Sequence, residues 1–285
     1  TSGWNGEPAA EAPAVTESGG ISWYQIEDAA DLAWFASEIN NGTDANAVLT
    51  SDIDLNGQNW TAIGTEKNPF KGKFDGKGHS ISNLSIDASS GYQGLFAYSS
   101  GTISNVDIKS GKVTNTASNT GSLVGINNAG GIVENCSSAA VVTDNSTSRS
   151  SYFGGLVGNN SGTITKSSFT GTVQTGNETI KQKNFGGIAG YMSDADAVIK
   201  GCVNTGSIKA YESVETGNTI VRTAGIVGNA DRTDHGIVPA DIDGYDPMGS
   251  ALWRTFRSSA PSVIAHENLL YKKPEYDTKV TVDSC

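Results

Sequence analysis

One feature constrains the fold more than any other: a glycine-led apolar segment recurs five times along the chain. When one leucine or isoleucine of each copy is aligned, successive copies are 28, 33, 32 and 38 residues apart. The aligned residues are Leu95, Leu123, Leu156, Ile188 and Ile226. A unit of about 30 residues with two or three short strands cannot bury its own apolar side, so successive units must stack on one another.

A second short strand follows each of the first four copies after eight to eleven residues. Its two inward positions are three residues apart: Ile103/Val106, Val133/Cys136, Ile164/Ser167 and Ile199/Cys202. We expect Ile81, Leu84 and Ile86 to form an earlier copy of the same strand. Short apolar runs separated by Gly, Asn and Ser are typical of strands joined by turns.

The repeats predict an all-β fold, a right-handed parallel β-helix (a β-solenoid) over residues 45–230, within a single domain. We expect the five aligned residues to form one inward row, with glycines at tight corners where φ is positive. A β-propeller is the alternative fold. Its blades need four strands in about 40–45 residues, and these repeats are shorter than that.

The N-terminal region has a different pattern, with apolar residues at helical spacing. They are Leu32, Phe35, Ala36 and Ile39. Asp28 and Asp31 favour a helix start, and the Asn-Asn-Gly sequence at 40–42 favours its end. Because a solenoid needs its end covered, residues 22–44 are predicted to form a cap containing this helix. Residues 1–21 are predicted to form an extended, flexible segment before the cap. Within the cap, we expect Trp34 to be a packing residue.

Several motifs precede the repeats in a fixed order, at residues 24–26, 31–36, 46–55, 60–64 and 70–84. Together with the later Gly-Leu-Phe and Gly-Gly-Leu-Val-Gly segments, they resemble the GLUG-repeat family over roughly residues 22–228 and the last few residues. That family occurs in large secreted or wall-attached bacterial surface proteins, and beside the catalytic part of IgA1-cleaving zinc metallopeptidases. The resemblance implies a β-helix that is secreted or on the cell surface. It implies no single activity, because fold alone does not determine function.

Charge and hydropathy exclude two classes of partner. The formal net charge is −11, charged residues make up 17%, and no basic run is present, so a nucleic-acid partner is excluded. No stretch reaches about 18 consecutive apolar residues, so we expect no membrane insertion.

Two motifs are candidates for catalysis. A zinc peptidase needs two histidines one helical turn apart, but His266-Glu267 is followed by Leu270 where the second ligand would stand, so no zinc peptidase site is predicted. The loop at residues 74–79, which contains Asp75, could be a catalytic loop or the turn that opens the first full coil. We favour the turn, and a carbohydrate-active enzyme (a glycosidase or a lyase) stays as an alternative.

Asp241, Asp243 and Asp246 surround a glycine in the manner of a calcium loop, whose oxygen ligands stand at alternate positions. An EF-hand would also need a glutamate near residue 253, which is absent, and Asp-Gly is common in plain turns. These three residues are weak calcium candidates, and no other cofactor is predicted.

The chain has three cysteines, Cys136, Cys202 and Cys285, each three residues after an inward strand position. We expect them to point inward as small apolar residues. The coil that contains Ser167 separates the first two by about 10 Å, which is two strand spacings. A disulfide needs Cα atoms within about 7 Å, so Cys136 and Cys202 should be free thiols.

One turn of the predicted solenoid is much longer than the others. Ile226 and Val282 are 56 residues apart, so about 45 extra residues, 231–278, form an insertion loop before a final strand at 279–285. Insertions in repeat proteins often lie on the binding face. The candidate ligand-binding residues are His235, Tyr245, Trp253, Arg254, Arg257, His266 and Tyr271. Alternatively, the insert is a cover that buries Trp253 and Phe256.

Three functions remain open. We favour a non-catalytic extracellular module of the surface or adhesion type, which binds a glycan or a host protein ligand. A carbohydrate-active enzyme is the first alternative, and a structural spacer in a larger secreted protein is the second. Since residue 285 falls within a strand by register, we also expect the chain to be part of a longer polypeptide or an assembly.

Overall fold

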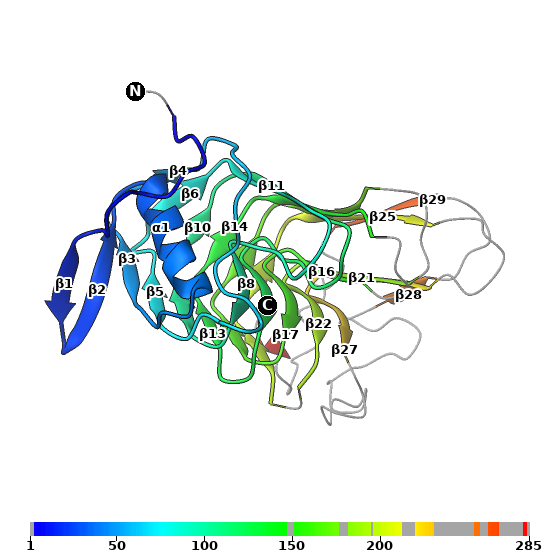
Figure 1. Ribbon diagram of the computed structural model, residues 1–285. Helices are drawn as coiled ribbons and strands as arrows, with labels where there is room; N and C mark the ends of the chain where they lie inside the picture. Colours follow the sequence, from blue (N-terminus) through cyan, green and yellow to red (C-terminus); the bar gives the residue numbers. More distant parts are fainter. Residues whose placement is uncertain are drawn as a thin grey trace.

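The computed structural model describes residues 3–146, 151–176, 182–194, 196–212, 220–230, 254–256, 262–267 and 282–283. Within these ranges the chain is almost entirely β-structure, with one α-helix near the N-terminus. The strands stack in about five turns, which run from the N-terminal coils (blue in Figure 1) to the later coils around β22 and β27 (yellow). The predicted β-solenoid is therefore confirmed.

Each coil contributes short strands to sheets that run along the solenoid. The first sheet contains β1 (Val15–Ser18), β2 (Ile21–Ile26), β3 (Ala47–Leu49), β5 (Lys73–Asp75), β9 (Thr102–Ser104), β13 (Ile132–Glu134), β18 (Thr163–Thr165), β23 (Val198–Lys200) and β30 (Val282–Asp283). The second contains β4 (Ile53–Asp54), β6 (Ser80–Ser82), β10 (Asp107–Ile108), β14 (Ser137–Ser138), β19 (Ser168–Phe169) and β24 (Val203–Asn204). The third contains β7 (Leu84–Ala88), β11 (Gly111–Asn115), β15 (Val141–Asp144), β20 (Thr172–Thr175), β25 (Ser207–Glu212) and β29 (Ser262–Glu267).

Two more sheets complete the coils. The fourth contains β8 (Phe96–Ser99), β12 (Val124–Asn127), β17 (Val157–Asn160), β22 (Ala189–Met192) and β27 (Val227–Ala230). The fifth, present only in the later coils, contains β16 (Ser151–Gly154), β21 (Gln182–Gly186), β26 (Ile220–Ala224) and β28 (Arg254–Phe256). Strands of successive coils pair in parallel, apart from β1 with β2, β25 with β29 and β26 with β28.

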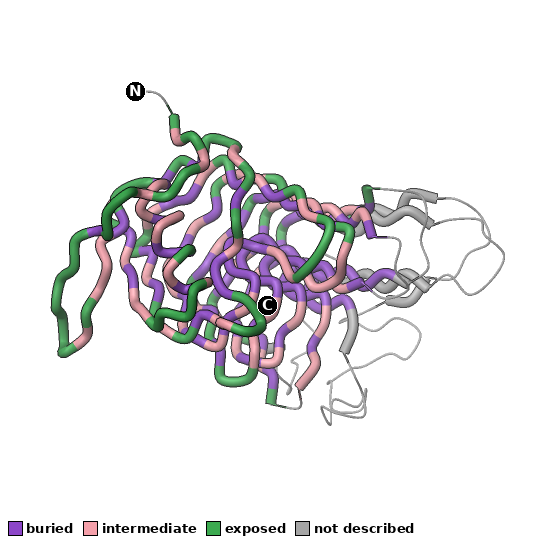
Figure 2. Tube along the Cα trace, viewed as in Figure 1, coloured by how far each residue is buried: buried purple, intermediate pink, exposed green. Residues whose placement is uncertain are grey.

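The five aligned leucines and isoleucines form the predicted inward row. Each directly precedes a strand of the fourth sheet, and none is more than 1% exposed. Backbone hydrogen bonds connect the row from coil to coil, for example from Leu123 N to Leu156 O (3.0 Å) and from Ile188 N to Ile226 O (3.0 Å). Figure 2 shows the buried residues (purple) along the coils, with exposed residues (green) at the turns and in the β1–β2 hairpin.

One predicted equivalence was wrong. Ile81 is not the earlier copy of Ile103, because Ile81 lies in β6 and pairs with Ile108 in the second sheet. The partner of Ile103 is Phe74 in β5. The prediction failed because two different corners have the same spacing of apolar residues. Asn83 lies between Ile81 and Leu84, Asn105 lies between Ile103 and Val106, and both asparagines have positive φ.

The glycines of the repeat serve a different purpose from the one expected. Those at 121, 154 and 158 do not have positive φ, and the described corners of that kind are formed mostly by asparagines and by other glycines. A Cβ added to Gly154 would lie 1.8 Å from the carbonyl oxygen of Val157, and one added to Gly158 would lie 2.4 Å from the amide nitrogen of Thr120. The motif therefore keeps two layers of backbone closer together than any side chain permits.

The predicted cap helix is present as α1 (Ala29–Asn40). Asp28 is its N-cap, and the Asp28 side chain accepts a hydrogen bond from the backbone nitrogen of Asp31. The residues predicted to face the core are all buried, and the ring of Phe35 lies 6.2 Å from Phe70 and 6.0 Å from Phe74, centroid to centroid. The helix therefore closes the N-terminal end of the solenoid core.

Cys136 and Cys202 are both buried and do not form a disulfide with each other, as the register predicts. Ile164 of the intervening coil pairs with both Val133 and Ile199, so one full coil separates the two cysteines. Burial raises the pKa of the Cys136 thiol to about 12. Cys285 lies outside the described residues.

The insert is more than the loop that the spacing predicted. Within it, β29 pairs antiparallel with β25 and β28 pairs antiparallel with β26. These strands cover the edges of the third and fifth sheets, whose unpaired backbone groups would otherwise remain open. Val282 of β30 pairs with Ile199, the partner expected from the register.

Candidate functional site

Most of the residues predicted to bind a ligand lie outside the described part of the chain. These are His235, Tyr245, Trp253, Arg257 and Tyr271, together with the calcium candidates Asp241, Asp243 and Asp246. Only the backbone of Arg254 and His266 is described: Arg254 lies opposite Thr223 in the fifth sheet, and His266 lies opposite Ile208 in the third. The structure thus places these two on different sheets, and a shared patch stays a prediction.

A groove that the sequence did not predict lies at the N-terminal end of the solenoid. It consists of two hollows, of about 310 and about 610 Å³, which share Asn40, Asn59, Trp60 and Thr61. Trp4 and the C-terminal part of α1 line the first hollow, and the turn at residues 86–93 lines the second. Three aromatic residues line the groove: Trp4 in the first hollow and Tyr92 in the second are partly exposed, whereas Trp60, shared by both, is only 3% exposed.

Trp60 is fixed in the floor of this groove. Its indole Nε1 donates a hydrogen bond to the carbonyl oxygen of Leu95 (3.1 Å), and its backbone nitrogen donates to Ser85 (2.7 Å). The ring of Trp4 lies 6.0 Å from that of Trp60, and Asn56 Nδ2 donates to the Trp4 carbonyl (2.9 Å). The N-terminal segment is thereby held against the first coil and forms a wall of the groove.

Asn40 positions the loop beside the floor. Its side-chain Nδ2 donates to the carbonyl of Ala62 (3.0 Å), and its Oδ1 accepts from the backbone nitrogen of Gly64 (2.7 Å). Asn59 Oδ1 accepts from the backbone nitrogen of Asp87 (3.0 Å), which connects this loop to the next coil. These hydrogen bonds hold the groove in shape before any ligand arrives, which reduces the ordering that binding requires.

The charge in the groove has one sign. Glu66 and Asp87 line it, both exposed, and no lysine, arginine or histidine is among its lining residues. Burial, with smaller contributions from Glu66 and then Tyr92, raises the pKa of neighbouring Tyr98. A negatively charged ligand would therefore find no counter-charge here.

Neither the groove nor the candidate loop has the features of a glycosidase. A glycosidase acid is shielded in an apolar pocket, whereas Glu66 and Asp87 of the groove are both exposed. Burial acts to raise the pKa of Asp75, but hydrogen bonds from Asn105 and Lys77 and the Lys77 charge outweigh it, so the pKa is lowered. Asp75 accepts from the Lys77 backbone nitrogen (2.8 Å) and Asn105 Nδ2 (2.8 Å), which makes it a corner residue.

A third hollow, of about 730 Å³, lies beside β7 and β11 and is lined by Leu84, Val141, two asparagines, Lys112 and small residues. It has no aromatic lining residue, which makes it a poorer ligand site than the groove. In the described parts of the chain, no cluster of three or more His, Cys, Asp or Glu residues has metal-binding geometry.

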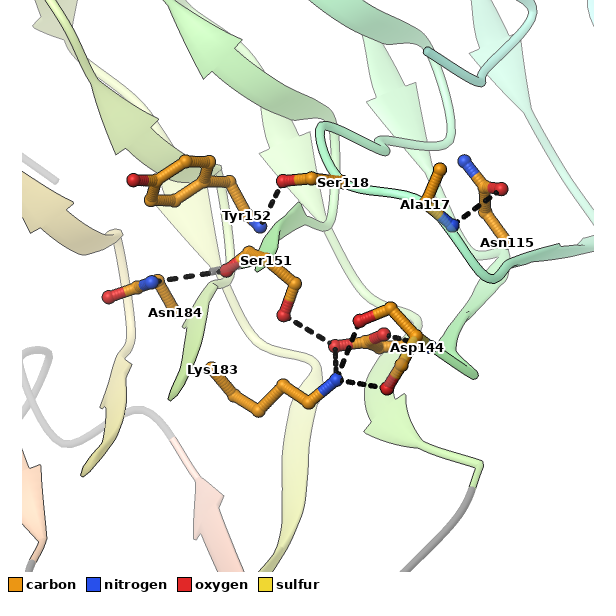
Figure 3. Close-up of polar contacts among 9 residues, drawn as sticks. Asn115, Ala117, Ser118, Asp144, Ser151, Tyr152, Lys183 and Asn184 are labelled. Atoms are coloured by element: carbon orange, nitrogen blue, oxygen red, sulfur yellow. Dashed lines mark hydrogen bonds and ion pairs between the residues drawn. The ribbon is translucent and has the colours of Figure 1, made fainter. Parts of the chain in front are cut away.

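A buried polar cluster, shown in Figure 3, lies between two coils. Lys183 Nζ is 2.9 Å from Asp144 Oδ2, and both side chains are 0% exposed. Nζ also donates to the backbone oxygen (2.6 Å) and the Oγ (2.7 Å) of Ser146. Ser151 Oγ donates to Asp144 Oδ2 (2.7 Å). Lys183 pairs with Ser151 across the fifth sheet, and alternation with buried Phe185 could have revealed that Lys183 faces inward.

This cluster contains a serine beside a lysine whose pKa burial lowers, a combination that also occurs in Ser–Lys hydrolases. Here Lys183 forms an ion pair with Asp144. The cluster is also not part of any of the three hollows described above. Ser146 itself is 0% exposed, so it does not face solvent in this arrangement.

Comparison with models of known protein families supports the resemblance found in the sequence. The family model described as the GLUG motif matches residues 150–174. The chain contains a GLUG motif. The match spans β16 to β20 and includes Gly154 and Gly158, so the resemblance found in the sequence is confirmed there.

One solved structure is similar to this chain: a candidate immunoglobulin A1 protease from Bacteroides ovatus. The identity is 19% and the TM-score is 0.47, over 73% of this chain and 84% of that one. No curated protein sequence matches the chain significantly. Among the described residues, no helix has the length and apolar character needed to cross a membrane.

Proposed function

We propose that this chain is a non-catalytic extracellular module of the surface or adhesion type that binds a glycan in the groove lined by Trp4, Trp60 and Tyr92. The observation that carries the proposal is this groove: partly exposed Trp4 and Tyr92 beside amide groups, over a floor in which Trp60 is only 3% exposed and is fixed by hydrogen bonds. Aromatic rings supply large apolar contact area, and a few placed polar groups supply specificity. The GLUG motif, typical of secreted and surface proteins, supports an extracellular location.

The charge of the groove narrows the ligand class. Glu66 and Asp87 repel uronic, sialic or sulfated sugars, and the net charge of −11 acts in the same direction. We therefore expect a neutral or an amino-bearing glycan. A protein ligand with an exposed basic surface is the other partner that this charge fits.

A glycan array probed with the purified chain tests the proposal, followed by titration calorimetry with the best neutral glycan. Tyr92→Ala should weaken binding by about tenfold or more, because loss of an aromatic anchor costs more than about 1.4 kcal/mol. Tyr191→Ala is the matched control, since Tyr191 is a half-exposed tyrosine of β22 outside the groove. Equal loss in both variants, or no glycan bound, contradicts the proposal and favours a spacer.

The carbohydrate-active alternative is tested in the same samples. Release of new reducing ends, or of unsaturated sugar products, from a bound polysaccharide would show glycosidase or lyase activity. Glu66→Gln and Asp87→Asn would then abolish the release if these carboxylates act on the substrate. We expect no product from the wild-type protein, from Glu66→Gln or from Asp87→Asn.

The insert is proposed as a second, separate contributor to binding through Trp253, Arg254 and Tyr271. Arg254→Ala should reduce binding while leaving the far-UV circular dichroism signal unchanged. If the insert is a cover, removal of residues 231–278 exposes the edges of β25 and β26 and causes aggregation. Intact binding in a soluble deletion variant would contradict both roles.

A further inference from the structure

The ion pair between Lys183 and Asp144 has no part in the groove. Removing two charges from water is unfavourable, and their mutual attraction often fails to compensate for it. The two side chains can also react with each other. The Lys183 nitrogen lies 2.9 Å from an oxygen of the Asp144 carboxylate, and both side chains are buried. We propose that Lys183 and Asp144 condense into an intramolecular isopeptide bond that links two successive coils covalently.

The reaction balances without an added reagent. The ammonium of Lys183 first transfers a proton to Oδ2 of Asp144, which leaves a neutral amine and a carboxylic acid. Nζ then attacks Cγ, the Nζ–Cγ bond forms, and the Cγ–Oδ2 bond breaks. Oδ2 leaves as water with two protons that came from Nζ, and Oδ1 becomes the amide carbonyl oxygen. Two charges disappear from the interior, and no electron is gained or lost.

The neighbouring groups are arranged for this step. The backbone nitrogen of Ser146 donates to Asp144 Oδ1 (2.7 Å), so it faces the oxygen that carries negative charge in the tetrahedral intermediate. Ser151 Oγ donates to Oδ2, the oxygen that leaves (2.7 Å). The backbone oxygen and Oγ of Ser146 hold Nζ in place. Burial also lowers the pKa of Lys183, which increases the neutral, nucleophilic form of the amine.

The topology gives the bond a mechanical role. Asp144 ends β15 and Lys183 lies in β21, one coil further along the solenoid. In the described residues, the paired strands of these two coils, β15 with β20 and β16 with β21, are held together by backbone hydrogen bonds and packing. A covalent bond between residues 144 and 183 would keep these coils together under a pulling force, independently of any ligand in the groove.

The intact mass of the full chain, measured after denaturation and reduction, tests the proposal. We expect a mass one water lower than that of the linear sequence, and after trypsin digestion a single branched peptide that joins Asp144 to Lys183. Lys183→Arg keeps the positive charge but should have the full linear mass, because a guanidinium is a poor nucleophile. A folded wild-type protein of full mass overturns the proposal.

Two further measurements separate the isopeptide bond from another way of losing one water. Asp144→Asn should yield a product of the same mass as the wild-type protein, because the identical amide forms with loss of ammonia instead of water. A succinimide at Asp144 also loses one water, but it leaves Lys183 in a linear peptide that trypsin cleaves after this residue. Water loss with such a linear peptide therefore also overturns the proposal.

Discussion

Gly158→Ala tests most directly whether the repeat glycines are needed for the close approach of the layers. In β17 the added Cβ would lie 2.4 Å from Thr120 N, 2.5 Å from Asn119 C and 2.7 Å from Gly125 O. All three are backbone atoms of neighbouring layers, so no side chain can rotate away. Gly158 does not have positive φ, so alanine adopts the same backbone conformation without strain. Only the close approach of the layers opposes the substitution.

The magnitude follows from these contacts. Ordinary van der Waals separation is about 3.5 Å or more, so the layers must separate by about 1 Å across a core that packs tightly. Overpacking costs about 1–3 kcal/mol and sometimes more, and three backbone contacts at once place this variant at the upper end. Alanine also reduces the entropy of the unfolded chain, which offsets about 0.4–1 kcal/mol. We expect a net loss of about 2–3 kcal/mol in the free energy of unfolding.

Gly130→Ala is the matched control. Gly130 has φ of +80° and nothing within 4 Å of an added Cβ, so the substitution costs only the left-handed conformation, about 1–2 kcal/mol before the same entropy offset. Urea unfolding, followed by circular dichroism, gives the free energy of unfolding of each variant. The two are compared with the same dependence of this free energy on urea concentration. The close-approach role is refuted if Gly158→Ala lies within 0.5 kcal/mol of the wild type (roughly the usual effect of a surface substitution), or costs less than Gly130→Ala.

Three further predictions follow from buried groups. Leu32→Ala should lower the free energy of unfolding by about 2–5 kcal/mol, because Leu32 is 0% exposed in the cap; an unchanged melting temperature would show that α1 does not close the core. The raised pKa of Cys136, about 12 in the folded state against 9.0 ordinarily, means that the unfolded chain loses its proton first. Stability should therefore fall as pH rises from about 9 toward 12, by up to about 1.4 kcal/mol per pH unit, and urea unfolding of Cys136→Ala should lack this contribution. Asn160→Ala removes the acceptor of Asn127 Nδ2 (2.8 Å) and the donor to Gly162 O (3.0 Å), and thermal unfolding should show a loss of about 1–3 kcal/mol; a smaller loss than that of an Asn128→Ala control would contradict it.

The position of each coil in the sequence and the stacking of successive coils could be predicted from the sequence, because both depend on local periodicity. Leu95 and its equivalents recur with the period of one coil, and a short strand with an apolar inward position can stack only on its like. The cap helix was equally accessible, since Asp28 and the apolar spacing of Leu32 and Phe35 are local signals. Even the partner of Val282 followed from register, across an insert of about 45 residues.

Tertiary structure alone decided the rest, because it depends on which distant segments meet. Ile81 and Ile103 have the same local spacing, and only strand pairing assigns them to different sheets. The groove joins Trp4, Trp60 and Tyr92, which are far apart in the chain, and no local pattern encodes that meeting. Alternation with Phe185 can place Lys183 on an inward face, but its partner Asp144 is decided only when the two coils pack together. Periodicity fixes how each coil folds, whereas contacts between segments distant in the chain depend on the lengths of the turns between the strands, and those vary from coil to coil.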